Sequence, residues 1–178
     1  MVHLSEYATV TENATLYEAV LALEAAQEKF EDKHTRYLHR AILILDKDEN
    51  VVGKISQLDV LRALEPKYQE MLQGEGLHRF GFTKEIEKSI LEDYQLFANP
   101  LDDICRKAGA QPVIKYMYTP TEGEYVSEDA SLDIAIHQFI IGHHQSLLVT
   151  RDKKIVGVLR LTDVFAAVFH KMKECFKT

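Results

Sequence analysis

Residues 51–60 read VVGKISQLDV, a stretch that begins like a buried strand and ends with a hydroxyl and a carboxylate, Ser56 and Asp59. If a helix begins after Ile55, Ser56 is its N-cap and Asp59 occupies position N3, from which the carboxylate can return a hydrogen bond to the backbone. The stretch therefore predicts a strand that runs directly into a helix. Capping alone can explain the serine and the aspartate, and a binding site is the alternative explanation.

A second copy of this pattern stands at residues 155–164, IVGVLRLTDV, with Arg160 in the place of the serine. A further block repeats in the same order, because VTENATLYEAV (10–20) aligns without gaps on VSEDASLDIAI (126–136). Two matching blocks indicate a duplicated unit. Arg160 has no side-chain oxygen with which to cap a helix, yet Asp163 is retained. The repeat therefore favours a binding role for the two aspartates.

Each unit contains an extended segment, a helix, a two-stranded hairpin and a closing helix. Thr15 and Glu18 fit a capping box at the first helix of unit one, and Ser131 can cap the matching helix of unit two. The hairpins begin with the strands AILIL (41–45) and SLLVT (146–150), each followed by a polar turn. This order predicts an α/β (α+β) fold made of two β-α-β-β-α units related by a pseudo-two-fold axis.

The predicted boundaries are 1–65 for unit one, 66–112 for a helical insert and 113–178 for unit two. Unit one has extra, helix-favouring residues at 25–38, which predict a longer first helix than in unit two. Within the insert, the apolar spacing of FTKEIEKSILEDYQLF (82–97) predicts an amphipathic helix. Asn99, as N-cap before Pro100, predicts another helix that extends through Arg106. The insert either packs on its own chain or contributes to a dimer interface.

The composition excludes several classes of protein. With a formal net charge of −7 and no basic face, the chain is a poor candidate for binding a nucleic-acid backbone. No apolar run is long enough for a membrane helix, and no signal peptide is visible, so we expect no membrane partner and a cytoplasmic location. Cys105 and Cys175 lack CxxC spacing and are interpreted as packing thiols in a reducing compartment.

The Ser-x-x-Asp spacing suits one kind of ligand. A carboxylate can accept hydrogen bonds from a vicinal diol such as a ribose, and a hydroxyl at a helix N-terminus suits a phosphate. Together the two groups match the polar ends of a nucleoside phosphate. No nucleophile or general base accompanies them, and the adjacent His143 and His144 lack further metal-ligating neighbours. We therefore expect a protein without catalytic or metal-binding residues, not an enzyme.

With its duplicated units and repeated motif, the chain resembles the CBS domain pair, also called a Bateman module. The resemblance rests on the duplicated β-α-β-β-α order and on the pattern G-x-h-[ST]-x-x-D, in which h is apolar, at the end of each unit. It implies a regulatory sensor that binds an adenosine-containing effector, AMP, ADP, ATP or S-adenosylmethionine, between the two units. It also implies a homodimer, an unidentified protein target and no required cofactor.

The resemblance also implies roles for individual residues. It assigns Asp59 and Asp163 to ribose hydroxyls and Ser56 to phosphate, and it places a few basic or polar side chains at the strand entrances near phosphates: His39, Arg40 and His144. The residues expected to flank the adenine are Thr11, Ser127, Ile55 and Leu159. Arg160 departs from the family pattern and either clamps a phosphate or fills the second site. If both sites are vestigial, the chain is instead a protein-interaction or oligomerisation scaffold.

Overall fold

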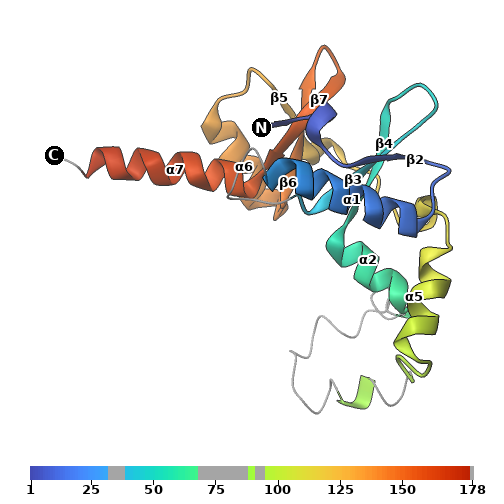
Figure 1. Cartoon of the computed structure of the whole chain (residues 1–178). Helices are drawn as coiled ribbons and strands as arrows, with labels where there is room; N and C mark the ends of the chain where they lie inside the picture. Colours follow the sequence, from blue (N-terminus) through green and yellow to red (C-terminus); the bar gives the residue numbers. More distant parts are fainter. Residues whose placement is uncertain (32–38, 68–87, 91–94, 177–178) are drawn as a thin grey trace.

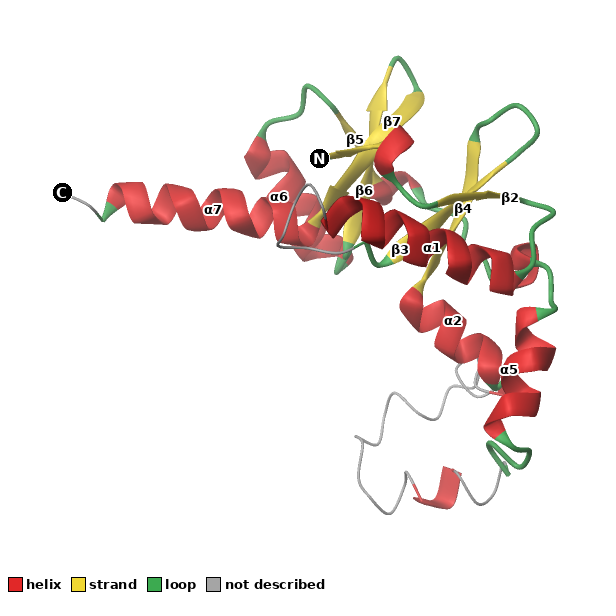
Figure 2. Ribbon diagram, viewed as in Figure 1, coloured by secondary structure: helices red, strands yellow, loops and turns green. Residues whose placement is uncertain are grey.

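Two small β-sheets lie side by side at the centre of the molecule, with helices around them (Figure 2). The structure is a computed structural model that describes residues 1–31, 39–67, 88–90 and 95–176. The elements of unit one are β2 (Thr9–Thr11), α1 (Leu16–Glu31), β3 (Ala41–Leu45), β4 (Val51–Ser56) and α2 (Gln57–Leu64). Those of unit two are β5 (Tyr125–Ser127), α6 (Leu132–Gly142), β6 (Ser146–Arg151), β7 (Lys154–Arg160) and α7 (Leu161–Cys175).

The strand pairing confirms the duplication. In unit one, β2 pairs in parallel with β3, which pairs antiparallel with β4. In unit two, β5, β6 and β7 repeat this order and these directions. Even the irregularity of the hairpin repeats, because the register shifts after Ile44 in β3 and after Val149 in β6. The two predicted β-α-β-β-α units are thus present as mixed α/β structures.

Each unit is joined at its edge by a segment from the other half of the chain. The N-terminal strand β1 (Val2–His3) pairs antiparallel with β7 of unit two. Conversely, Tyr118 of the segment before unit two forms an antiparallel bridge with Lys54 of β4, through backbone hydrogen bonds of 2.9 and 2.8 Å. The two exchanged segments tie the units together.

The two repeated glycines lie where these exchanged segments approach most closely. A Cβ at Gly157 would stand 2.5 Å from the backbone carbonyl oxygen of Val2, and a Cβ at Gly53 would stand 2.6 Å from the sulfur of Met117. At Gly157 the neighbour is backbone, so a side chain would force strand β1 to move, whereas at Gly53 the neighbour is a flexible side chain that can move instead. The packing between units therefore requires the glycine of unit two more strictly than the glycine of unit one.

Strands β3 and β6 are buried on both faces, which explains their uninterrupted apolar sequences. Ile42 and Ile44 point into the core of unit one, whereas Leu43 points the other way, into a central cluster shared by both units. The central cluster contains Val2, Tyr7, Ala41 and Leu43 from the N-terminal half and Leu148 and Val158 from unit two. Alternating side chains of one strand thus serve two cores.

The predicted cap of the first helix is present in unit one, but the corresponding cap in unit two is not. Thr15 and Glu18 form the predicted capping box, with Glu18 N donating to Thr15 Oγ1 at 3.2 Å and Thr15 N donating to Glu18 Oε2 at 2.7 Å. Ser131 occupies the N-cap position of α6, but its side chain makes no capping hydrogen bond, so that expectation was wrong. Helix α1 has 16 residues and α6 has 11, which confirms the longer first helix.

Most of the predicted helix over 82–97 lies outside the described residues. Of its described part, 88–90 is helical and 95–97 is a turn. The second predicted helix is present as α5 (Leu101–Gly109), but Pro100 is its N-cap because the backbone there is still extended (ψ 142°), so the prediction was one residue early. α5 lies against α1 and α2 (Figure 1).

The two cysteines do not pack in a core. Cys105 on α5 and Cys175 at the end of α7 are both exposed, so their interpretation as packing thiols was wrong. In each helix the buried side chains are those of other residues. Ile104 and Ala108 are the buried residues of α5, and Val164 is the buried residue of α7. Hydrophobic composition alone does not determine which face of a helix a cysteine occupies.

Candidate functional site

A cleft of about 540 Å³ opens between the two units. Both strand-to-helix junctions of the repeated pattern reach it, one at the start of α2 and the other at the start of α7. Most of the residues that line it have polar or charged side chains, and they come from both halves of the chain: Tyr7, Arg40, Ala41, Lys54, Ser56, Gln57, Leu58, Asp59, Arg62, Tyr118, Glu124, Gly142, His143, His144, Gln145, Ser146, Arg160, Leu161 and Thr162.

Ser56 and Asp59 form a complete capping box at the start of α2. The Ser56 hydroxyl donates to Asp59 Oδ2 at 2.6 Å, and the Ser56 amide donates to the same oxygen at 2.9 Å. Asp59 Oδ1 accepts from Arg62 at 3.2 Å. Ser56 and Asp59 remain half-buried at the edge of the cleft. A ligand that approached them would find a carboxylate and a hydroxyl oriented by a helix.

The matching junction in unit two is closed by an ion pair. Arg160 holds Asp163 through two side-chain bonds, Nε to Oδ2 at 2.9 Å and Nη2 to Oδ1 at 2.5 Å. The Arg160 amide donates to Asp163 Oδ2 at 3.2 Å, so Asp163 also caps α7. The Arg160 side chain is only 10% exposed. Asp163 therefore has a structural role that the sequence interpretation did not foresee, and the bidentate guanidinium occupies both of its oxygens.

Positive charge predominates in the cleft, although the chain is acidic overall. Of the lining residues, four are lysine or arginine (Arg40, Lys54, Arg62 and Arg160), and two are aspartate or glutamate (Asp59 and Glu124). Two imidazoles, those of His143 and His144, also line the cleft. Asp163 pairs with Arg160 from outside the lining, so the four cations face three carboxylates and a small excess of positive charge remains. Such an excess in a concave site favours an anionic ligand even when the net charge of the protein is negative.

One of these cations belongs to a buried network that joins the two units. Lys54 of β4 donates to Glu124, which lies in the short helix η3 (Glu122–Glu124) before β5. The carboxylate also accepts from Tyr118 Oη at 2.6 Å and from the Thr121 amide at 3.0 Å. Burial raises the pKa of Glu124, but these hydrogen bonds outweigh it, so the pKa lies below its ordinary value. Glu124 is therefore ionised at neutral pH.

The structure brings only part of the predicted set into the cleft. Ser56, Asp59, Arg40, His144 and Arg160 line it together. The remaining predicted residues are not part of the lining: Asp163, His39, Thr11, Ser127, Ile55 and Leu159. Asp163 is held by Arg160, and Thr11 and Ser127 are exposed residues at the ends of their strands. His39 and Ile55 are fully buried, and Leu159 packs against the core of unit two.

Sequence reasoning missed several polar residues of the cleft, among them Lys54, Arg62, Tyr118 and Glu124. Two of them had a signal in the spacing. Lys54 precedes Ser56 by two residues and therefore shares its face of the strand, and Arg62 lies one helical turn after Asp59. The other two precede strand β5, and no spacing relates them to the repeated pattern.

Tyr7, which lines the cleft, forms an aromatic pair with the buried His39, with ring centroids 4.5 Å apart in an edge-to-face arrangement. His39 is fully buried and Tyr7 is 6% exposed. Burial lowers the pKa of His39, and the charge of Arg160 lowers it further, so the imidazole is neutral at pH 7. A neutral, buried His39 is not placed to face a phosphate, unlike its neighbour Arg40.

Alkaline pH should destabilise the fold through Tyr7. Burial raises the pKa of Tyr7 from 10.0 to about 12. Between these values the unfolded chain loses the phenolic proton while the folded chain retains it, so the free energy of unfolding falls as pH rises, by at most about 2.7 kcal/mol. Urea unfolding of the wild type and of Tyr7→Phe at about pH 9 and about pH 11 measures this effect. An equal loss in both proteins would contradict the prediction.

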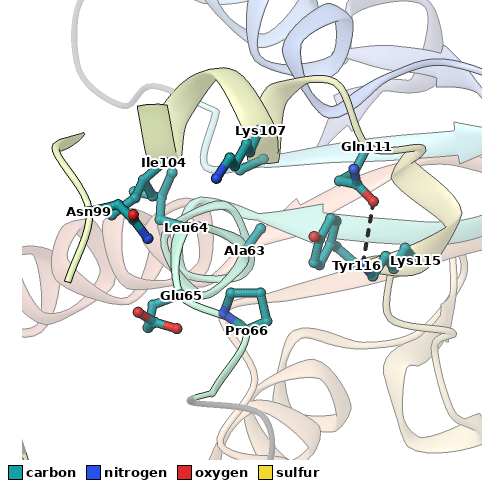
Figure 3. Close-up of a pocket in the computed structure, with 11 residues that line it drawn as sticks. Ala63, Leu64, Glu65, Pro66, Asn99, Ile104, Lys107, Gln111, Lys115 and Tyr116 are labelled. Carbon is teal, nitrogen blue, oxygen red and sulfur yellow. Dashed lines mark hydrogen bonds between the residues drawn. The ribbon is translucent and has the colours of Figure 1, made fainter. Parts of the chain in front are cut away.

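A second, smaller pocket of about 280 Å³ lies between α2, α5 and residues 115–116 (Figure 3). Apolar side chains such as Ala63 and Ile104 line it together with Lys107 and Lys115, the latter donating to Gln111 at 3.3 Å. The buried Glu65 carboxylate accepts from the backbone amide of Phe97 at 2.9 Å. This pocket thus offers a ligand fewer fixed polar groups than the cleft.

Two further properties concern the described part of the chain. No helix there is long and apolar enough to cross a membrane. No group of three or more histidine, cysteine, aspartate or glutamate side chains is arranged there to hold a metal ion.

Several solved structures share this arrangement of two units. A CBS domain-containing protein from Bacillus anthracis superposes with a TM-score of 0.60 at 16% identity, covering 96% of this chain and 90% of its own. CBSX2 in complex with AMP gives a TM-score of 0.57 at 17% identity, with coverages of 97% and 94%. A CBS-domain protein from Agrobacterium tumefaciens gives 0.56 at 16% identity, with coverages of 91% and 84%. No curated protein sequence matches the chain.

The sequence itself matches a family model. The CBS domain model matches twice, at residues 2–66 and 113–170, which together make up more than half of the chain. Each match contains one of the two units and its strand-to-helix junction. The chain therefore belongs to the CBS domain family.

Proposed function

We propose that this protein is a regulatory module that binds an adenosine-containing ligand, AMP, ADP, ATP or S-adenosylmethionine, in the cleft between its units. The observation that carries the proposal is that Ser56 and Asp59 stand at the start of α2 among four basic side chains of the cleft. The carboxylate suits the ribose diol, and the basic side chains suit an anionic group. The AMP complex of CBSX2 is consistent with this ligand class.

Ligand binding at this site requires Ser56 and Asp59 to exchange their mutual hydrogen bond for hydrogen bonds to the ligand. The single proton of the Ser56 hydroxyl is donated to Asp59 in the ligand-free arrangement. In the complex the hydroxyl would turn toward the phosphate, and Asp59 would accept from the ribose instead. Asp163 does not line the cleft, and its bidentate partner Arg160 is only 10% exposed, so this aspartate is not placed to make the same exchange. We therefore propose one adenosyl ligand per chain, held by the junction of unit one.

The module would transmit the effect of ligand binding by associating with a second copy of the chain or with another protein. Helix α7 extends past the rest of the molecule (Figure 1) and exposes several large apolar side chains: Phe165, Phe169, Met172 and Phe176. The rings of Phe165 and Phe169 stack with centroids 6.5 Å apart. Exposed apolar patches of this kind mark interaction surfaces. We propose a homodimer or an unidentified protein target at this face, and the same surface would serve a scaffold if the cleft were empty.

Thermal unfolding with millimolar AMP, ADP, ATP and S-adenosylmethionine tests the proposed site. A ligand at about 100 times its Kd stabilises the fold by about 2.7 kcal/mol, which gives a clear rise in Tm. Asp59→Ala should abolish that rise. Asp103→Ala is the matched control, because Asp103 also pairs with an arginine three residues later, Arg106, but lies outside the cleft. It should retain the full ligand-induced rise.

Two outcomes of this experiment would contradict the proposal. If none of the four compounds raises Tm, the sensor function is wrong and the scaffold is favoured. If the rise survives Asp59→Ala unchanged, the ligand binds elsewhere. Light scattering on the same samples measures the mass with and without ligand, and a monomer under both conditions would argue against the homodimer.

A further inference from the structure

The ion pair between Lys54 and Glu124 is the feature of the cleft that neither the repeated pattern nor the proposed ligand contacts explain. It joins strand β4 of unit one to the segment that leads into unit two. The Glu124 side chain is 1% exposed and the Lys54 side chain 15%. A buried ion pair contributes little net stability compared with an apolar pair, so its presence beside a binding cleft points to another role.

Lys54 lies next to the proposed phosphate position. Residues 54 and 56 share one face of β4, because side chains alternate along a strand, and the strand advances by roughly 6.6 Å over two residues. Both side chains line the cleft. The flexible four-carbon stem of a lysine allows its ammonium group to move over such a distance. A phosphate at Ser56 would therefore be within reach of Lys54.

Glu124 does not depend on Lys54 alone. Tyr118 Oη and the Thr121 amide both donate to Glu124 Oε1, at 2.6 and 3.0 Å, so this oxygen keeps its partners if the lysine moves. Lys54 donates to the other oxygen, Oε2. Transfer of the ammonium to a phosphate would therefore break one bond of the network without dismantling the rest.

We propose that the ligand phosphate and Glu124 compete for Lys54, so that binding of a phosphate-bearing ligand draws the ammonium group away from Glu124 and loosens the tie between the two units. This inference rests on the proposed function, because it assumes an adenosyl ligand at Ser56. It makes Lys54 a residue that couples ligand binding to the contact between units. It also makes the affinity depend on Glu124, a residue that need not touch the ligand.

Calorimetric titration with AMP and with adenosine tests this competition. Glu124→Gln keeps the shape of the side chain and an oxygen that can accept from Tyr118, but it removes the charge that holds Lys54. AMP should then bind about five- to tenfold more tightly, whereas the affinity for adenosine, which has no phosphate, should change less than about twofold. Lys54→Met should weaken AMP binding by about tenfold and leave adenosine binding unchanged.

The control is Glu128→Gln, which removes a glutamate paired with Arg151 outside the cleft and should alter neither affinity. Unaltered or weaker AMP binding by Glu124→Gln would overturn the competition. If that variant does not fold, Lys54→Met decides: AMP affinity equal to the wild type would overturn the proposal. A wild type that binds none of AMP, ADP, ATP and S-adenosylmethionine would instead contradict the proposed function, so the two failures are distinguishable.

Discussion

Replacing Arg160 with methionine is expected to lower the free energy of unfolding by about 3 kcal/mol. Arg160 is 10% exposed and Asp163 is 19% exposed, and the two are joined by bonds to both carboxylate oxygens. Removing the guanidinium leaves a partly buried carboxylate with only its backbone partner. This loss of stability lies at the low end of the range for breaking a buried ion pair, because water can still reach Asp163. Urea unfolding at neutral pH measures it.

The exposed pair of Arg106 and Asp103 provides the control for this prediction. Its side chains are 76% and 50% exposed, so Arg106→Met should cost less than about 1 kcal/mol, although the spacing of the pair is the same. Equal losses for Arg160→Met and Arg106→Met would show that burial does not determine the value of the Arg160 pair.

A serine at the same position tests whether Arg160 blocks a second site. Arg160→Ser restores the Ser-x-x-Asp pattern of unit one and releases Asp163 from the guanidinium. If the first site binds AMP as proposed, this variant should bind two molar equivalents of AMP and the wild type one, as counted by calorimetry. An unchanged stoichiometry would show that removing Arg160 does not open unit two.

Gly157→Ala is expected to lower the free energy of unfolding by a similar amount, about 3 kcal/mol. The new Cβ would stand 2.5 Å from the carbonyl oxygen of Val2, a backbone atom held in the β1–β7 pairing. Strand β1 would have to shift, which would expose the side chain of Val2, now 4% exposed. Burial of a valine contributes about 1.5–3 kcal/mol, and the strained pairing adds to the loss.

The matched substitution in unit one is Gly53→Ala. There the Cβ would stand 2.6 Å from the sulfur of Met117, the far end of a flexible side chain that can rotate away. We expect a loss of roughly 1 kcal/mol or less. Urea unfolding of both variants measures the difference. If Gly53→Ala cost as much as Gly157→Ala, the distinction between a backbone and a side-chain neighbour would not account for these glycines.

The predicted fold was largely correct because its signals are local. The Thr15–Glu18 and Ser56–Asp59 capping boxes depend on atoms three residues apart, and both are present. The duplication identified the second unit even where its capping residue differs. Predictions failed where they required the buried face of a helix to be identified, as for the two exposed cysteines. Helical periodicity allows a residue near the edge of an apolar stripe to be either buried or exposed.

The candidate site could be predicted only in part. Sequence comparison between the units identified Ser56, Asp59 and Arg160, which line the cleft. It placed His39 beside Arg40 as a second basic group, but neighbouring residues of an extended segment point to opposite sides, and His39 is buried against Tyr7. It also treated the return of Asp163 as evidence of binding, whereas Arg160 and the α7 cap give that carboxylate a structural role.

The sequence by itself determined the duplicated β-α-β-β-α order, the strand-to-helix junctions and the family, because these depend on short-range hydrogen bonding and on a repeat that alignment reveals. Only the tertiary structure decided that Lys54 pairs with Glu124, a residue 70 positions away. It also decided that the repeated glycines lie in close contact with segments of the opposite unit. Such contacts depend on how the two units pack, and no spacing along the chain encodes that arrangement.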